Sequence, residues 1–116
     1  MIKEKFSELE DLCLNELVGS KDFIKRVYDY SLEDLMLKKR ERPLVYARHS
    51  IFYALRNRGF SLTTIGTVFN LDHTTIIHGL KNIDYMFESR LNGFATKEDR
   101  EILALTKIFL RFLNKR

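Results

Sequence analysis

The sequence predicts an all-α fold, a small helical domain built around a helix-turn-helix. Apolar residues recur at helical spacing along most of the chain, and Ser, Thr or Asp stands where several helices would begin. The sequence contains no pair of strand-like segments and no internal repeat. With 116 residues, the chain can build one hydrophobic core but not two. We therefore expect a single domain overall.

The first helix is predicted between Ile2 and Val18, and Gly19 ends it. Cys13 falls on its apolar stripe, so we expect a small core residue there rather than a nucleophile. A single cysteine excludes an internal disulfide framework and is typical of the reducing cytoplasm. We expect no signal peptide and no membrane span, because charges interrupt the start and no apolar run approaches roughly 18 residues. The stripe consists of Ile2, Phe6, Leu9, Cys13 and Leu17.

Two further helices are predicted before residue 38. Ser20 is expected to cap a helix that runs through about Tyr28. Ser31 and Asp34 have the spacing of a capping box, in which each side chain bonds the backbone N–H of the other residue. They predict a short third helix.

A strongly basic segment follows this acidic start. Residues 1–34 carry a net charge of −4, whereas residues 38–58 carry seven bases and one acid, a net charge of +6. We predict a loop up to Arg42 and a helix that begins at Pro43, since a proline in the first turn lacks only an N–H that is unpaired there anyway. The segment is typical of a phosphate-binding surface, with a solvated charge run as the alternative. The bases are Lys38, Lys39, Arg40, Arg42, Arg48, Arg56 and Arg58, and the fourth helix is expected to bury Leu44, Ala47, Ile51, Ala54 and Leu55.

The most informative segment spans residues 61–83 and reads as two helices joined by a tight turn. Ser61 is a good N-cap, and Asn70 tolerates the left-handed conformation that ends helices. Asp72 then caps a new helix at once, and Gly66 is small enough to let another backbone approach. Such a turn makes the helices cross steeply, as in a helix-turn-helix that places its second helix in a DNA major groove. The apolar residues of the first helix are Leu62, Ile65, Val68 and Phe69.

The second helix of this motif has two different faces. One face is apolar and must point to the core, while the opposite face is rich in short hydrogen-bonding groups and weakly charged. Readout of base edges or phosphates and an ordinary polar surface explain this outer face about equally well. The apolar face holds Ile76, Leu80, Ile83 and Phe87, and the polar face Thr74, His78, Lys81, Asn82 and Tyr85.

A last helix is predicted after a loop at Asn92 and Gly93, with Thr96 and Asp99 as its capping box. Its apolar residues exceed one stripe, because Leu103 and Leu110 lie about 100° from the centre of that stripe. We expect the two terminal helices to pack together, with a dimer face as the alternative. Accordingly we divide the chain into a packing helix, residues 1–19, and a DNA-binding domain, residues 20–116. The stripe itself consists of Ile102, Leu105, Phe109, Phe112 and Leu113.

These features resemble the C-terminal DNA-binding domain of the bacterial replication initiator DnaA, an all-α fold similar to the Trp repressor. The resemblance covers roughly residues 23–87 and, more loosely, the last helix from Lys97. Asp-His-Thr-Thr followed by two aliphatic residues and His is its most specific part. The matching residues are the Lys-Lys-Arg-Glu-Arg stretch, Ala47-Arg48, Ser61-Leu62, Ile65-Gly66, Phe69, Asp72 to His78 and Lys81-Asn82-Ile83.

The resemblance implies roles for single residues. The segment that reads bases in the major groove corresponds to Asp72, His73, Thr74 and Thr75. Phosphate contacts are implied for His78 and Lys81, and a DNA backbone contact for Leu62. An arginine of the basic loop reaches the minor groove in that family; Arg48 or Arg42 is the candidate here, because the spacing differs by one residue. The charge pattern adds phosphate candidates, which are Lys38, Lys39, Arg40, Arg42 and Arg56.

Two departures from the family are visible. Asn70-Leu71 stands where the family has Gly-Gly-Arg, which shortens the turn, removes a cation and puts the usual target sequence in question. We expect Leu71 to pack under this turn. No GxxxxGK[ST] phosphate loop occurs in these residues, so we expect no nucleotide binding of the family's kind and no cofactor.

Catalysis and metal binding are not expected. His73 and His78 are about 140° apart on a helix, too far for one ion, and nothing places a nucleophile beside a base. The sequence therefore predicts a non-enzymatic cytoplasmic protein that binds double-stranded DNA, in replication initiation, its regulation or transcription. A second copy or a replication initiator is a further candidate partner. A phage or mobile element is an expected source of such a protein. The alternative is a helical module that docks on a replication protein without reading DNA.

Overall fold

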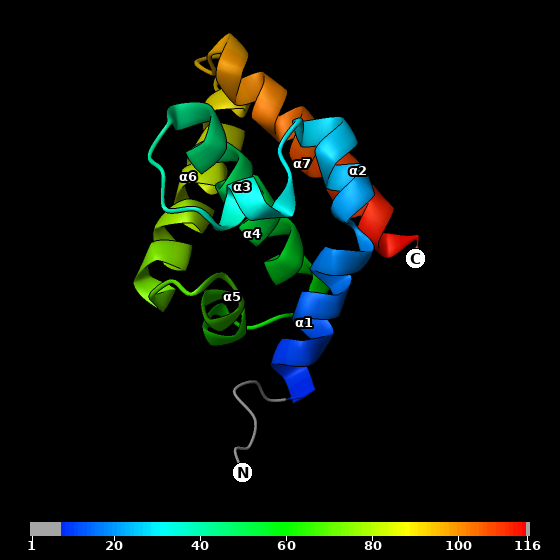
Figure 1. Cartoon of the computed structure of the whole chain (residues 1–116). Helices are drawn as coiled ribbons and strands as arrows, with labels where there is room; N and C mark the ends of the chain where they lie inside the picture. The colour runs from blue at the N-terminus through cyan, green and yellow to red at the C-terminus, as the bar shows by residue number, and fades with distance from the viewer. Residues whose placement is uncertain (1–7, 116) are drawn as a thin grey trace.

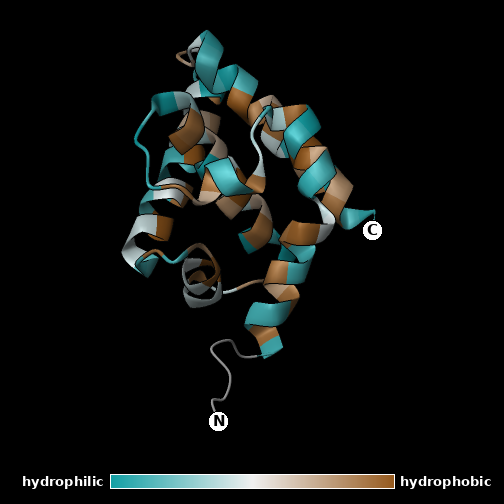
Figure 2. Ribbon diagram, viewed as in Figure 1, coloured by the Kyte–Doolittle hydropathy of each residue, from teal (hydrophilic) through white to brown (hydrophobic). Residues whose placement is uncertain are grey.

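The computed structural model describes residues 8–115, which form seven helices and no strand and confirm the all-α prediction (Figure 1). Figure 2 shows hydrophobic segments on the sides of the helices that face one another and hydrophilic segments outside. In the part of the chain that is described, no helix is both long and apolar enough to cross a bilayer. The helices are α1 (Glu8–Gly19), α2 (Lys21–Tyr28), α3 (Leu32–Met36), α4 (Arg42–Arg58), α5 (Leu62–Phe69), α6 (His73–Leu91) and α7 (Lys97–Asn114).

The centre of the fold is α4, which contacts α3, α5, α6 and α7. All five residues that the sequence assigns to its inner side are buried, and Phe52 is buried with them. A buried chain of hydroxyls fixes its neighbours: Ser50 on α4 is hydrogen-bonded to Tyr28 on α2 (2.7 Å between the oxygens) and to Thr106 on α7. Because buried polar groups are costly when unpaired, these linked hydroxyls specify how α2 and α7 lie on α4.

The N-terminal helices differ from the sequence prediction in two ways. Ser20 does not cap α2 with its side chain; its hydroxyl donates to the carbonyl of Glu16 at 2.7 Å and is buried. Cys13 is a core residue as predicted, and burial raises the pKa of its thiol to about 12. Leu9, assigned to the same stripe, is exposed, because α1 turns its buried side toward Cys13 and Leu17. Ile2 and Phe6 lie outside the described residues.

The two terminal helices share one core, which includes Cys13 and Leu17 of α1 and Phe109 and Leu113 of α7, but neither is the main neighbour of the other. The main contact of α1 is with α5, and an ion pair of 2.8 Å joins Glu16 to Arg58 at the end of α4. In contrast, α7 lies along α4 and α6. Leu103 is buried against Ile83 of α6, so one of the surplus leucines of α7 is used inside the domain. The division into residues 1–19 and 20–116 stays a prediction.

The turn between α5 and α6 has the predicted geometry. Ser61 caps α5 by accepting the N–H of Thr64 at 3.1 Å, and Asn70 ends the helix in the left-handed conformation with φ 57°. The N–H of Leu71 then donates to the carbonyl of Gly66 at 2.8 Å, which closes the turn tightly. A Cβ atom at Gly66 would lie 2.7 Å from the carbonyl oxygen of Leu71. The turn therefore requires a residue without a side chain at this position.

We predict that Gly66→Ala destabilises the protein, although alanine is normally the better helix former by about 1 kcal/mol. The new methyl group would push against a backbone carbonyl that cannot rotate away, so we expect a net loss of about 1–3 kcal/mol of unfolding free energy in urea. The control is Thr63→Ala at an exposed position of the same helix. A Gly66→Ala protein at least as stable as its parent would contradict the close approach.

Candidate nucleic-acid interface

The polar face of α6 is exposed as the sequence predicts. Thr74, His78, Lys81 and Tyr85 are exposed, whereas Asn82 is half-buried. On the opposite side Ile76 and Ile83 are fully buried, but Leu80 and Phe87 are only half-buried, because the buried side also includes Gly79, Met86 and Ser89. The helix thus presents short polar side chains to solvent over its first three turns.

The N-terminal end of α6 is built by Asp72. Its carboxylate caps the helix by accepting the N–H of Thr74 at 3.5 Å, and one oxygen lies 3.1 Å from Nδ1 of His73. The side chains of Asp72, His73, Thr74 and Thr75 are all exposed. This end therefore offers a carboxylate, an imidazole and two hydroxyls, together with the partial positive charge of a helix N-terminus.

The basic loop between α3 and α4 is held from behind by Arg48. One nitrogen of its guanidinium donates to two backbone carbonyls, that of Leu37 at 2.7 Å and that of Lys39 at 2.6 Å. Burial lowers the pKa of Arg48, and its Nε atom is buried without a hydrogen-bond partner among residues 8–115. The side chains of Lys38, Lys39 and Arg40 are exposed. Arg48 therefore fixes the path of the loop and leaves its cations to solvent.

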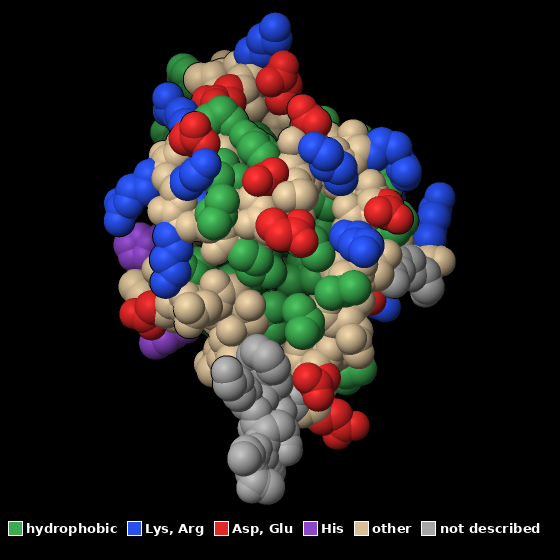
Figure 3. Space-filling model, in the orientation of Figure 1, with side chains coloured by type: hydrophobic (Ala, Val, Ile, Leu, Met, Phe, Trp, Pro, Cys, Tyr) green, Lys and Arg blue, Asp and Glu red, His purple; other side chains and the backbone are tan. Residues whose placement is uncertain are grey.

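One groove, of about 510 Å³, brings the loop and α6 together. Among the described residues that line it, four side chains are cationic and one, that of Asp72, is a carboxylate, so its field favours an anion. Figure 3 shows histidine side chains at the left edge of the molecule, at the N-terminal end of α6, with Lys or Arg side chains near them. The sequence-predicted residues that line the groove are Lys38, Lys39, Arg40, Arg48, Asp72, Thr74, Thr75 and His78.

The remaining predicted residues lie outside this groove. Nε of Arg42 lies 3.4 Å from the hydroxyl of Tyr46 and 3.6 Å from Glu98, on another side of α4. The guanidinium of Arg56 donates to the carbonyl of Phe60. Leu62 is half-buried against the core, while His73 and Lys81 are exposed beside the groove on α6.

The floor of the groove is formed by Phe52, His49 and Leu71, of which the sequence analysis singled out only Leu71. Leu71 packs against the core as predicted and also lines the groove with Phe52. His49 on α4 was not anticipated; its Nδ1 lies 3.0 Å from the amide nitrogen of Asn82 on α6. Since an amide N–H₂ only donates, Nδ1 accepts and the ring proton resides on Nε2. No local pattern identifies His49, because its partner is 33 residues away.

Comparison with known proteins places the chain in a family. Residues 21–83 match the family described as the bacterial dnaA protein helix-turn-helix, which is more than half of the chain. The chain belongs to this family. The groove lies entirely within the matched residues.

Several relatives of this chain are chromosomal replication initiator proteins DnaA. The protein of Oenococcus oeni is 31% identical over 105 residues, which is 81% of this chain and 23% of that protein. The protein of Caldanaerobacter subterraneus is 37% identical over 87 residues, 66% of this chain and 20% of its own length. The chain therefore spans about a fifth of the relatives that it matches. No solved structure matches it closely.

We predict that His49 makes the fold sensitive to mild acid. Burial and then the charge of Arg48 lower its pKa from 6.5 to about 4 in the folded state. Between these two values the unfolded chain binds the proton and the folded chain does not, so stability falls as the pH drops through this window. We expect the difference in melting temperature between the parent and His49→Gln to shrink as the pH falls from 7 to 4.

The control for this prediction is His78→Gln, since His78 is exposed on α6. Its melting temperature should follow that of the parent across the same window. A constant difference between His49→Gln and the parent would show that His49 does not carry the effect.

Proposed function

We propose that this chain binds double-stranded DNA at a specific sequence, with the N-terminal end of α6 in the major groove and the basic loop on the DNA backbone. The observation that carries the proposal is the groove that joins the two elements, in which four cations lie beside exposed hydroxyls. The chain belongs to the dnaA helix-turn-helix family, and its relatives are replication initiators. Both facts support a role in replication initiation, its regulation or transcription.

The division of labour follows from the chemistry of the exposed groups. The hydroxyls of Thr74 and Thr75 and the imidazole of His73 suit base edges, and Asp72 suits the amino group of a cytosine. His78 and Lys81, farther along the same face, suit phosphates, and Leu62 at the start of α5 is proposed to touch the backbone. Together these residues would fix α6 in the major groove of the DNA.

The loop supplies the sequence-independent part of the affinity. Lys38, Lys39 and Arg40 are exposed on a loop whose path is fixed, so they would meet phosphates at a small cost in ordering. Arg48 would reach bases only through guanidinium N–H groups that are not bonded to the carbonyls of Leu37 and Lys39. Arg42 and Arg56 are committed to other contacts and would reach only the edge of a duplex.

A protein-interaction module is the competing function. The observation that favours it is the exposed apolar surface of α1, where Leu9 and Leu12 are 61% and 53% exposed beside acidic residues. Such a module would not retard a labelled duplex at moderate salt. Retardation that depends on the sequence of the duplex would favour the DNA-binding function.

We predict that replacing Lys38, Lys39 and Arg40 with alanine weakens binding to every duplex. Each lost phosphate contact should flatten the slope of log K against log salt by about 0.9, because fewer counterions are released. Affinity is measured at several salt concentrations. The matched control replaces three exposed cations of α2, Lys21, Lys25 and Arg26, and changes the net charge by the same amount. Equal slopes for the two triple variants would place the contact surface elsewhere.

We also predict that His73→Ala and Thr74→Ala lose about 1–3 kcal/mol of binding free energy on the preferred site, with little change on random DNA. The preferred site is first obtained by selection from a random pool of duplexes. His78→Ala is the contrast, since loss of a phosphate contact should weaken binding to both kinds of DNA alike. Uniform weakening by His73→Ala and Thr74→Ala would show that these residues do not read sequence.

A further inference from the structure

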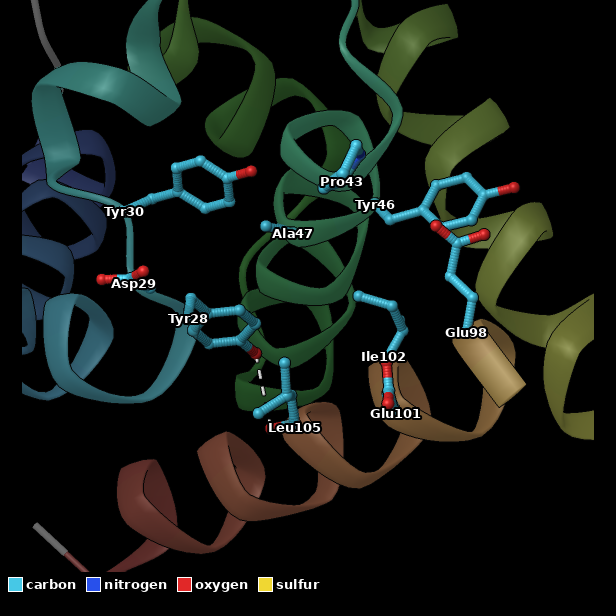
Figure 4. Close-up of a pocket in the computed structure, with 10 residues that line it drawn as sticks. All are labelled: Tyr28, Asp29, Tyr30, Pro43, Tyr46, Ala47, Glu98, Glu101, Ile102 and Leu105. Carbon is cyan, nitrogen blue, oxygen red and sulfur yellow. Dashed lines mark hydrogen bonds between the residues drawn. The ribbon is translucent and has the colours of Figure 1, made fainter. Parts of the chain in front are cut away.

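A second hollow lies on the side of α4 that faces away from the groove. It has a volume of about 350 Å³ and lies between α2 with its following loop, the start of α4 and the first half of α7. Figure 4 shows its lining residues on these three elements, with the side chains of Tyr28, Ile102 and Leu105 turned toward one another and that of Asp29 turned away. At 100° per residue, Pro43 and Ala47 on this side of α4 point roughly opposite to Val45 and Phe52 of the groove. A molecule in the hollow would therefore not collide with DNA bound at the groove between the basic loop and α6.

The floor and walls of the hollow are apolar and aromatic. Ile102 and Leu105 of α7 contribute aliphatic surface, and the buried Tyr28 presents its ring, since its hydroxyl is occupied by Ser50 and the carbonyl of Leu105. Tyr30 and Tyr46 are half-buried and add two more rings. The hollow is thus suited to a side chain with a long hydrocarbon portion or a flat polar group.

The rim of the hollow is acidic. Among the described residues that line it are three carboxylates, those of Asp29, Glu98 and Glu101, and no Lys, Arg or His. Asp29 lies 3.7 Å from Lys25 and Glu98 lies 3.6 Å from Arg42, and both are exposed pairs of modest strength. The rim therefore attracts a cation and repels the phosphates of a nucleic acid.

The chain itself shows how this rim holds a guanidinium. The charged group of Arg42 lies 5.6 Å from the centre of the Tyr46 ring and is paired with Glu98 at the edge of the hollow. Tyr30 and Glu101 provide a second ring and a second carboxylate in the same hollow. An arginine combines a flat cation that stacks on rings with a fork of donors that matches carboxylates, whereas lysine provides only a point charge.

We propose that this hollow binds an arginine side chain of a partner protein. The hydrocarbon stem of the arginine lies along Ile102, its guanidinium lies against the ring of Tyr30, and Glu101 accepts its hydrogen bonds. Because the hollow and the groove occupy opposite sides of α4, the domain would hold a protein on one side while the other side remains open to DNA. Arginine is also the cationic residue that anchors protein interfaces most often.

The test uses the whole chain without DNA, so its outcome is independent of duplex binding. The ¹⁵N-labelled protein is titrated with the capped peptide acetyl-Gly-Arg-Gly-amide and, separately, with the same peptide carrying citrulline, which has the same shape without the charge. We expect saturable shifts of the amide signals of Tyr30, Ala47 and Glu101, with half-saturation at about 1–10 mM for the arginine peptide. The citrulline peptide should bind at least about tenfold more weakly.

Glu101→Gln is the variant that removes one rim carboxylate, and Glu88→Gln is its matched control at an exposed position of α6. The first should weaken binding of the arginine peptide several-fold, and the second should leave it unchanged. Equal binding of the citrulline peptide would overturn the proposal, as would full affinity in Glu101→Gln. Shifts confined to the acidic residues of α1, or a titration that does not saturate, would likewise overturn it.

Discussion

The close packing of α4 against α6 is the constraint on which the rest of the structure depends. Gly79 lets the two helices approach, since a Cβ atom there would lie 2.7 Å from Cδ2 of His49 and 3.1 Å from Cδ2 of Phe52. The hydrogen bond between His49 and Asn82 then fixes one helix along the other. Because Arg48 is the neighbour of His49 and holds the basic loop, adjacent residues of one helix set the position of both parts of the groove.

A small number of contacts also fixes the elements on the opposite side of α4. The hydroxyls of Tyr28, Ser50 and Thr106 link α2, α4 and α7 through the core, and Thr106 also donates to the carbonyl of Ile102. Phe23 of α2 stacks on Phe112 of α7, with ring centres 4.0 Å apart. These contacts bring together the three elements around the acidic hollow. A rigid central helix thus separates two surfaces of opposite charge.

Local signals in the sequence predict local structure well here. The capping boxes at Ser31 and Thr96 and the left-handed Asn70 are formed as expected, because each needs only residues three or four positions away. Ser20 failed as a side-chain cap because its hydroxyl donates to the carbonyl of Glu16 instead. Leu9 was assigned to the buried stripe but is exposed, because α1 packs on the domain through the side that holds Cys13 and Leu17. The groove was predicted only as two separate segments. Its floor depends on the contact of His49 with Asn82, which no periodicity within one helix reveals.

The way in which Arg48 holds the loop has a consequence for sequence change. Its guanidinium binds the backbone carbonyls of Leu37 and Lys39, which every residue type possesses. The shape of the loop is therefore independent of the identity of the side chains that project from it. A loop of this design can exchange its surface chemistry during evolution, or in the hands of an engineer, while its main chain keeps the same course.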